Sequence, residues 1–159
     1  MDISEATHRD AGEILTLQKI AFLPEARLYG NHDIAPLTQT IEEMQAGIAR
    51  MTVLKAVSAG EIVGSVRGGT DGGICRVGRL VVHPGHQRRG IGLRLMHQLE
   101  ERFTASCEWF EIFTGHRSGG PLSLYAKLGY RKFREEFVRD GLTLIFLRKP
   151  SQGKSEVRL

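Results

Sequence analysis

Long apolar runs are missing from this 159-residue sequence. No stretch approaches the roughly 20 apolar residues that a helix needs to cross a bilayer. The N-terminal residues MDISEATHRD also lack the basic region followed by an apolar stretch that marks a secretory signal peptide. These two absences predict a cytoplasmic protein without a membrane partner.

Cysteines and metal-ligand clusters are scarce as well. Only Cys75 and Cys107 are present, too few for a disulfide framework and not spaced as a CxxC pair, so we expect reduced thiols. The six histidines are scattered. His83 and His86 are close together, but they flank a Pro-Gly turn and no second ligand pair follows at metal spacing. We therefore expect polar loop histidines and no metal site.

The composition that remains is that of one globular domain. Hydrophobic residues make up 41% of the sequence and charged residues 25%, which provides enough apolar surface for a single core. We expect the domain to span residues 1–150 and the polar segment 151–159 to form a short C-terminal tail.

The net charge is 22 − 18 = +4, but it is unevenly distributed. Residues 1–50 carry 4 basic and 8 acidic side chains (−4), residues 76–102 carry 6 and 2 (+4), and residues 131–159 carry 8 and 4 (+4). The middle block suggests a basic patch that would suit a nucleic acid. However, the sequence has no known reader motif and few aromatic residues lie between the basic ones, so we expect no nucleic-acid partner.

Hydrophobic periodicity predicts a mixture of helices and strands. A helix opens at Asp10 and ends at Pro24, and the segment 23–36, rich in Pro, Gly, Asn and Asp, is predicted as a loop. The apolar run 109–113 predicts a buried strand. The other expected strands are 2–6, 52–58, 62–67, 74–82, 131–138 and 142–147, and the other expected helices are 37–50, 90–103 and 121–128. This order predicts a mixed α/β domain.

The segment from Arg79 to Gly92 passes from a predicted strand through a turn into a helix, and it has the features of an anion-binding site. N–H groups at a helix N-terminus lack intrahelical partners and carry the positive end of the dipole. Gly90 and Gly92 let a phosphate approach the backbone, and Arg88 and Arg89 add positive charge. The alternative is that the glycines only permit close packing of the helix on the sheet. The sequence contains no P-loop run (GxxxxGKS/T) and no GxGxxG dinucleotide pattern.

Two runs are informative together: QRRGIG at 87–92, preceded by LVVHP at 80–84, and SLYAKLGY at 123–130. The first resembles the Q/R-x-x-G-x-G/A signature, with its usual LxVxP, of the GNAT superfamily of acetyl-CoA-dependent N-acetyltransferases. The second resembles that family's LYxxLGF segment, and the order of elements matches nearly the whole chain. The resemblance implies a single-domain GNAT-like fold of the mixed α/β (α+β) class. Its central, mostly antiparallel sheet would contain a splayed strand pair and be flanked by about four helices.

The resemblance also implies acetyl-CoA as co-substrate and indicates where it binds. Leu80, Val81 and Val82 lie where the family's splayed fourth strand pairs its backbone with the pantetheine arm, although their apolar side chains also suit a core. The family binds the CoA pyrophosphate, chiefly through backbone N–H groups, at the positions of Arg88, Arg89, Gly90, Ile91, Gly92 and Leu93.

Tyr125 matches the family's usual general acid. Acetyl transfer expels CoA as a thiolate, which leaves more readily when a donor protonates it, and a phenol with a pKa of about 10 carries its proton at neutral pH. From the residues alone, the alternative is an aromatic side chain on the inner face of a helix with Leu122 and Leu128.

Three positions depart from the family pattern. An Asn that contacts CoA, seven residues before the catalytic Tyr, is replaced by Ser118, which can cap the helix and still reach the cofactor. An Ala three residues after that Asn is replaced by Pro121. The catalytic Glu that many members carry on the fifth strand is replaced by Phe113, so the resemblance assigns no general base.

An amine with a pKa of about 10 must lose a proton before it attacks, directly or through water. Glu111 is a candidate acceptor because it shares the face of Phe113, two residues away on the strand. His116 is another, because histidine titrates near neutral pH. The alternatives are an ordinary solvated strand residue for Glu111 and an ordinary loop residue for His116.

The acceptor is expected near the N-terminal helices, which overhang the substrate cleft in this family. Tyr29, Asn31, His32 and Asp33 are the candidate contacts because their polar, irregular segment suits recognition; an ordinary solvated loop is the alternative. The −4 charge of residues 1–50 favours a cationic amine, although charges are screened over about 8 Å at physiological salt.

These observations predict an N-acetyltransferase that transfers the acetyl group of acetyl-CoA to a primary amine by direct attack in a ternary complex. The sequence does not identify the acceptor, which is a small-molecule or peptide amine. The alternative function is a non-catalytic CoA or acyl-CoA sensor or interaction domain, suggested by the missing Glu and Asn. Members of the family commonly pair through their C-terminal strands, so a homodimer is one expected assembly.

Overall fold

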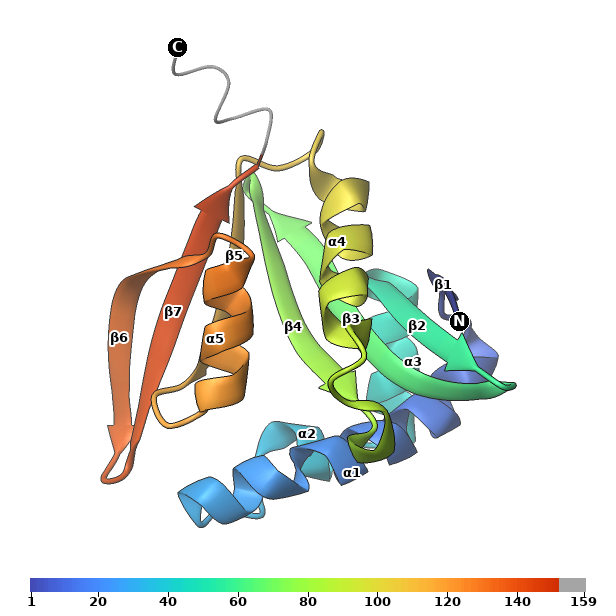
Figure 1. The fold of residues 1–159 in the computed structure, drawn as a ribbon, viewed down its shortest axis with the longest axis horizontal. Coiled ribbons are helices and arrows are strands. Elements are labelled where there is room, and N and C mark those ends of the chain that lie inside the picture. The colour runs from blue at the N-terminus through green and yellow to red at the C-terminus, as the bar shows by residue number, and fades with distance from the viewer. Residues whose placement is uncertain (152–159) are drawn as a thin grey trace. The chain divides into compact units, whose positions relative to one another are not determined.

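The computed structural model describes residues 1–151, and the rest of the expected tail lies outside the described residues. Seven strands lie within this part of the chain: β1 (Asp2–Glu5), β2 (Thr52–Ser58), β3 (Glu61–Asp71), β4 (Ile74–Val82), β5 (Trp109–Gly115), β6 (Arg131–Arg139) and β7 (Leu142–Pro150). The helices are α1 (Ala11–Tyr29), α2 (Ala35–Thr38), α3 (Ile41–Arg50), α4 (Ile91–Phe103) and α5 (Gly119–Lys127), with 3-10 turns η1 (His8–Asp10) and η2 (Pro84–His86) (Figure 1). None of the helices described is both long and apolar enough to cross a membrane.

The chain forms two compact units. The first contains Met1–Gly69 and Arg79–Leu99, and the second contains Thr70–Gly78 and the chain from Glu100 onward. Strand β4 and helix α4 therefore each contribute to both units.

The strands hydrogen-bond in the order β1-β2-β3-β4-β5-β7-β6. The pairs β1–β2, β2–β3, β5–β7 and β6–β7 are antiparallel. In contrast, β4 and β5 are parallel, and their register contains only three residue pairs, from Ile74↔Trp109 to Arg76↔Glu111. The mixed, mostly antiparallel sheet is confirmed, and the short β4–β5 register agrees with the expected splayed pair.

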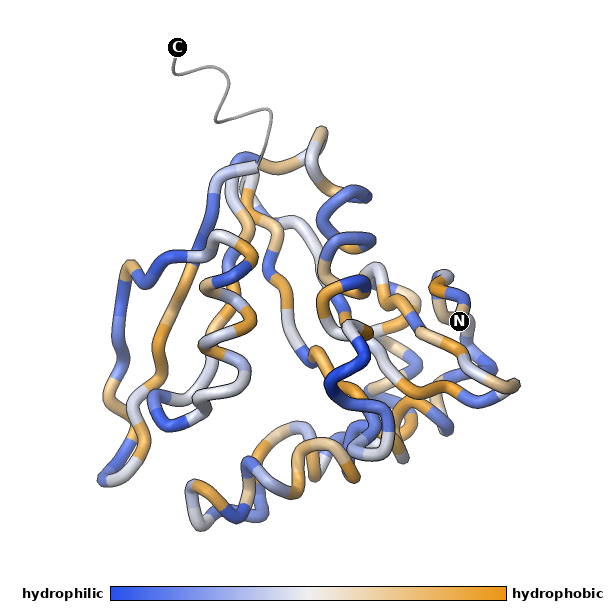
Figure 2. Tube along the Cα trace, viewed as in Figure 1, coloured by the Kyte–Doolittle hydropathy of each residue, from blue (hydrophilic) through white to orange (hydrophobic). Residues whose placement is uncertain are grey.

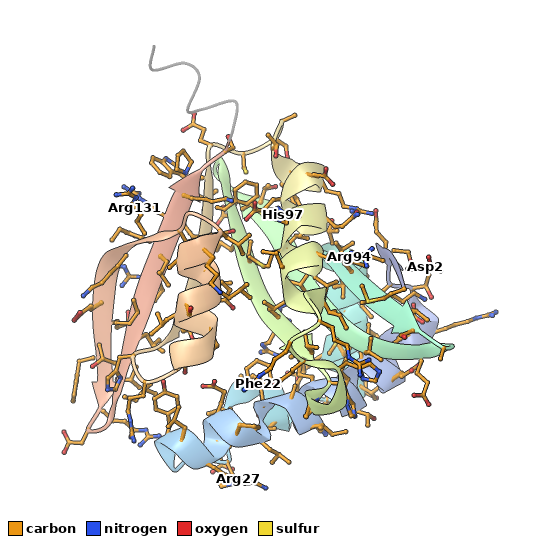
Figure 3. The ribbon with its side chains drawn as sticks, in the orientation of Figure 1. Asp2, Phe22, Arg27, Arg94, His97 and Arg131 are labelled. Atoms are coloured by element: carbon orange, nitrogen blue, oxygen red, sulfur yellow. The ribbon has the colours of Figure 1, made fainter. Side chains whose placement is uncertain are left out.

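In the first unit, helices pack on both faces of the strands (Figure 1). Helices α1 and α3 contribute to a core cluster with β2, β3 and β4, and Phe22 of α1 (Figure 3) packs against that cluster. Helix α4 lies on the opposite face, because a Cβ placed on Gly64 of β3 would meet Ile91 Cγ2 and Leu95 Cδ1, each at 3.0 Å. The buried cluster on the α1–α3 side consists of Ala11, Ile14, Leu15, Leu17, Met44, Val53, Ile62 and Val81.

The predicted end of the first helix at Pro24 is wrong. Helix α1 continues through Pro24 to Tyr29 and ends at Gly30, whose φ of 63° is the left-handed conformation common at helix ends. Proline removes one helical hydrogen bond and crowds the preceding turn. We attribute the continuation to packing beyond the proline, since Ala26 is completely buried.

The predicted helix 37–50 is divided in two. Residues Ala35–Thr38 form the short α2, and α3 starts only at Ile41. Thr40 explains this start, because its Oγ1 accepts from the Glu43 N–H at 3.1 Å while its own N–H donates to Glu43 Oε1 at 2.8 Å. This reciprocal capping box specifies a helix N-terminus.

In the second unit, α5 packs against one face of β5 and β7. Phe110, Ile112 and Leu147 are buried there with Tyr125 and Leu128. The predicted strand 109–113 is present but is not buried on both faces, because Phe113 is 56% exposed. Strands 52–58 and 74–82 match their predicted bounds, whereas β3, β5, β6 and β7 extend further than predicted.

A buried polar network joins α4, β7 and the start of β6 in this unit. Glu100 accepts from the Tyr130 hydroxyl at 2.7 Å through Oε2 and pairs with Lys149 Nζ at 2.7 Å through Oε1. Lys149 also donates to the Leu128 carbonyl oxygen at 2.8 Å. Burial, followed by the charge of Glu100, raises the pKa of Tyr130 far above its usual value, so this tyrosine remains a neutral donor.

Three basic side chains of the C-terminal block make contacts with aromatic or acidic side chains of this unit. The Arg134 guanidinium lies 3.8 Å from the centroid of the Phe146 ring, and that of Arg148 lies 4.3 Å from the Trp109 centroid. Such cation–π contacts, together with the Lys132–Glu135 ion pair, give these basic side chains structural roles.

Candidate functional site

The predicted anion-binding residues 88–93, which we call the anion cradle, lie entirely in the first unit, between the end of β4 and the start of α4. The first helical backbone bond runs from the Arg94 N–H to the Gly90 carbonyl at 3.0 Å. The N–H groups of Ile91, Gly92 and Leu93 thus precede the helical ladder and are available to an anion. Figure 2 shows that the connection leading into α4 is strongly hydrophilic.

The turn before α4 contains two residues with positive φ, Arg88 at 65° and Gly90 at 77°. A Cβ placed on Gly90 would meet no heavy atom within 4 Å. Close packing on the sheet therefore does not explain this glycine, but its backbone conformation does. The open space leaves room for a ligand against the backbone.

Side chains around the cradle separate into a buried anchor and an exposed rim. Ile91 is 5% exposed, whereas Arg88, Arg89 and Leu93 are exposed. Further along α4, Leu95, Met96 and Leu99 are completely buried, while Arg94 and His97 (Figure 3) face solvent. No Asp or Glu occurs between Ile74 and Leu99, so the local charge is positive and fits a pyrophosphate.

Two histidines shape the turn at η2. His83 Nδ1 accepts from the Gly85 N–H at 3.0 Å, and the His83 N–H donates to the Val63 carbonyl of β3 at 2.8 Å. The His86 ring lies 5.6 Å from that of His83, and its Nδ1 is buried without a hydrogen-bond partner in the described structure. Within residues 1–151, no group of three or more potential ligand side chains could hold a metal ion.

The first unit also contains a polar pocket of about 380 Å³ that the sequence did not reveal. Three arginines from three different elements line it: Arg50 at the end of α3, Arg67 on β3 and Arg79 on β4. The remaining lining residues are Ala35, Thr38, Gln39, Glu43, Ala46, Gly47 and Met51.

The pocket arginines influence one another electrostatically. Burial, followed by the charge of Arg67, lowers the pKa of Arg79 to about 10, and Glu43 partly opposes this shift. Burial, followed by the charge of Arg50, lowers the pKa of Arg67. Guanidinium groups are cationic in proteins, so the three arginines make the pocket positive. A charged residue inside a predicted strand, as at Arg67 and Arg79, is the signal that would have pointed to it.

The predicted acceptor segment lies next to this pocket in the sequence but does not line it. Tyr29 is the last residue of α1, and Asn31 Oδ1 accepts from the Asp33 N–H at 3.0 Å in a local turn. His32 and Asp33 are exposed. The lining begins two residues later, at Ala35 of α2.

The predicted catalytic residues belong to the second unit. Tyr125 lies on α5, is 6% exposed, and its ring centroid is 6.0 Å from that of Tyr130. Ser118 is the N-cap residue of α5 and is 2% exposed. Its side chain makes no capping hydrogen bond, which corrects that expectation. The Ser118 carbonyl accepts from the Leu122 N–H at 3.1 Å, which is the first helical backbone bond of α5.

The two candidate bases differ in how their acceptor atoms are used. Glu111 lies on β5, where its Oε1 pairs with Arg76 Nη1 of β4 at 3.1 Å. At the end of β5, His116 Nδ1 accepts from the Thr143 N–H of β7 at 3.0 Å. The same Nδ1 lies 3.3 Å from the Thr143 carbonyl oxygen, so this ring nitrogen faces the Thr143 backbone in either tautomer.

The predicted site residues thus form two groups. The cofactor-binding stretch from Leu80 to Leu93 and the segment 29–33 belong to the first unit, whereas Tyr125, Glu111, His116 and Ser118 belong to the second.

Comparisons with known proteins bear on this arrangement. The sequence model of the family described as "Acetyltransferase (GNAT) domain" matches residues 25–150. The chain is 27% identical over 149 residues to the UPF0157 protein YqkA of Bacillus subtilis (strain 168), which covers 94% of this chain and 43% of that protein. It is 37% identical over 78 residues to Acetyltransferase SG1711 of Sodalis glossinidius (strain morsitans), covering 48% and 55%. The chain therefore spans about half the length of the curated relatives it matches.

Solved structures share the fold. One is yncA, a putative acetyltransferase from Salmonella typhimurium with its cofactor acetyl-CoA, at a TM-score of 0.78 and 20% identity over 96% of this chain and 94% of that chain. Another is the ribosomal-protein-S18-alanine N-acetyltransferase from Escherichia coli, at a TM-score of 0.77 and 15% identity over 94% and 93%. At these identities the likeness establishes the architecture.

Proposed function

This chain belongs to the GNAT family of acetyltransferases, and on that premise we propose that it transfers the acetyl group of acetyl-CoA to a primary amine by direct attack within a ternary complex. The cradle between β4 and α4 carries this proposal. It combines helix N-terminal N–H groups, a left-handed turn at Arg88 and Gly90 and two exposed arginines, in a stretch from Ile74 to Leu99 without Asp or Glu. These features suit a pyrophosphate.

In this proposal the residues of the first unit hold the co-substrate. The backbone N–H groups from Arg88 to Leu93 bind the pyrophosphate, and the backbone of Leu80, Val81 and Val82 binds the pantetheine arm as an added strand would. Acetyl-CoA supplies the thioester whose acetyl carbon the amine attacks. The Val82 N–H polarises the thioester carbonyl, and most of the rate enhancement comes from positioning.

The residues of the second unit move the protons. The Tyr125 phenol donates its proton to the departing sulfur, so that CoA leaves as a thiol rather than a thiolate. Glu111 accepts the proton that the amine releases, directly or through water. We favour it over His116 because its carboxylate keeps acceptor capacity beyond the Arg76 pair, whereas His116 Nδ1 is engaged by Thr143. Ser118 contacts the co-substrate in place of the family's Asn.

A thiol-release assay with acetyl-CoA and a panel of primary amines tests the proposal. Tyr125→Phe should lower kcat by about 100-fold or more, while acetyl-CoA binding measured by calorimetry stays unchanged. Tyr130→Phe is the matched control, because Tyr130 is another buried tyrosine of the same unit and is bonded to Glu100. It should lower stability and leave kcat unchanged.

Two results would contradict the proposal. If Tyr125→Phe retained the wild-type kcat, Tyr125 would not be the general acid. If acetyl-CoA bound tightly and no amine in a broad panel were acetylated, the domain would be a CoA-binding module without transferase activity.

A further inference from the structure

The arginine pocket of the first unit is positively charged and is not neutralised from within. Arg50, Arg67 and Arg79 line it with a single carboxylate, that of Glu43. Glu43 Oε1 already accepts the Thr40 N–H in the α3 capping box. In the part of the chain that the structure describes, no ion pair joins any of the three arginines to an acidic side chain. Arg67 and Arg79 are half-buried, whereas Arg50 and Glu43 are exposed. Holding like charges close together at a partly buried site is unfavourable unless an anion compensates them.

The pocket arginines are held by the surrounding structure. Arg79 Nη1 donates to Gln39 Oε1 at 2.7 Å, and Gln39 Oε1 also accepts from Gln18 Nε2 at 2.8 Å. Gln18 is 2% exposed and donates further to the Pro36 carbonyl at 3.0 Å. These hydrogen bonds connect α1 to β4 and hold the Arg79 guanidinium through one of its N–H groups. A guanidinium has five N–H donors, so Arg79 retains donors for a ligand.

Two local backbone features accompany the pocket arginines. Arg79 has a φ of 51°, a conformation that a non-glycine residue adopts only when its surroundings impose it. Arg67 passes over Gly47 of α3, where a Cβ would lie 4.0 Å from its Nη1. The strained backbone and the small residue together suit a built site rather than a chance cluster.

We propose that this pocket binds an anionic group, a carboxylate or a phosphate monoester, carried by the acceptor amine. The proposal rests on the amine acetyltransferase function and narrows its substrate class to small molecules that carry both an amine and an anion. Guanidinium groups bind carboxylates and phosphates through paired, charge-assisted hydrogen bonds. A volume of about 380 Å³ lies in the lower part of the range for small-molecule sites, which favours such a ligand over a folded protein.

The position of the pocket on β4 agrees with this role. Arg79 precedes Val82, whose N–H we assign to the thioester carbonyl, by three residues on the same strand. At about 3.3 Å per residue their backbones are roughly 10 Å apart. An anion held by the long Arg79 side chain therefore leaves the amine of a small molecule free to extend toward Val82. The acidic balance of residues 1–50 predicted a cationic acceptor, whereas this pocket favours one that also carries a negative charge.

Pairs of amines in which one member carries an anionic group and the other does not test the proposal. One arm compares L-amino acids with their C-terminal amides, and the other compares phosphoethanolamine with ethanolamine. We expect kcat/KM for the anionic member of at least one pair to exceed that of its neutral partner by about 10- to 100-fold. The arm that shows the preference identifies the anion as carboxylate or phosphate.

Arg67→Gln and Arg79→Gln should remove that preference by raising KM for the anionic member, with little effect on the neutral member and on acetyl-CoA binding. Arg9→Gln, an exposed arginine of η1 in the same unit, is the matched control and should retain the preference. Circular dichroism melting verifies that each variant is folded. Arg67→Lys and Arg79→Lys should keep part of the preference because lysine keeps the positive charge.

A direct measurement of anion binding distinguishes failure of the anion pocket from failure of the proposed transferase function. Calorimetry or thermal shift with acetate and with inorganic phosphate measures the pocket without any transfer step. Anion binding that both arginine variants abolish, in a chain that acetylates nothing, would support the pocket and refute the transferase. Equal kcat/KM for anionic and neutral partners, or no anion binding by the wild-type chain, would overturn the anion pocket and leave the transferase standing.

Discussion

Replacing Gly64 by alanine should loosen α4 from β3 and thereby disturb the helix N-terminus that we propose binds the pyrophosphate. Gly64 is buried in β3 directly under α4. A Cβ there would lie 3.0 Å from Ile91 Cγ2, 3.0 Å from Leu95 Cδ1 and 3.2 Å from the Val81 carbonyl oxygen. Ile91 is the first residue of α4, so a shift that relieves its clash moves the cradle.

The size of the effect follows from these contacts. The ends of the Ile91 and Leu95 side chains can move by a few tenths of an ångström, but the Val81 oxygen is backbone and moves only with β4. Adding a methyl group to a packed core costs about 1–3 kcal/mol, and the lower unfolded-state entropy of alanine offsets about 0.5–1 kcal/mol of that. The net loss is about 1 kcal/mol, which lowers the Tm by about 2–4 °C.

Thermal unfolding and acetyl-CoA calorimetry measure the two consequences. Gly78→Ala is the matched control, because Gly78 is another strand glycine without positive φ, and a Cβ there would meet nothing within 4 Å. It should match or slightly exceed wild-type stability and leave acetyl-CoA affinity unchanged. If Gly64→Ala were as stable as Gly78→Ala and bound acetyl-CoA equally well, the packing of α4 on Gly64 would not position the cradle.

Two further predictions concern stability. Lys149→Met leaves Glu100 buried without its cation and should lower the free energy of unfolding in urea by about 3 kcal/mol. Lys132→Met removes the partner of Glu135, which is about half exposed, and should lower it by less than about 1 kcal/mol. Equal losses would show that the buried network contributes little. Burial raises the pKa of Asp10, but the Thr7 N–H and Lys55 outweigh it, so the folded pKa lies below the ordinary value. The carboxylate therefore stabilises the fold above about pH 4, and the stability difference between wild type and Asp10→Asn should shrink as the pH falls below that value; a difference independent of pH would refute this.

Local sequence pattern predicted the elements whose signals are local. The four-residue apolar spacing from Ile91 to Phe103 produced helix α4, and the strands 52–58 and 74–82 have their predicted bounds. Pro24 shows where local rules fail, since the helix continues through it when residues beyond it are buried. The sequence also contains a signal for the break before α3, because Thr40 and Glu43 have capping-box spacing. The predicted helix 37–50 did not take this signal into account.

The arginine pocket could not be predicted because it depends on residues distant in the sequence. Arg50, Arg67 and Arg79 come from three elements, and the Gln18–Gln39 chain that holds Arg79 joins α1 to the segment after α2. The net charge of residues 1–50 is negative, whereas the pocket is positive. The two differ because acidic residues such as Asp10 and Glu13 are bonded elsewhere, to Lys55 and to the Ile62 N–H. The cradle was predictable because its backbone pattern is contiguous.

The proposed reaction transfers an acetyl group from acetyl-CoA to an amine. The most direct measurement incubates the purified chain with acetyl-CoA and the matched amine panel, and quantifies CoA thiol and acetylated amine together by mass spectrometry. We expect equal amounts of the two products with at least one amine that carries an anionic group, and the loss of both products in Tyr125→Phe. CoA release without an acetylated amine, or tight acetyl-CoA binding with neither product, would contradict it.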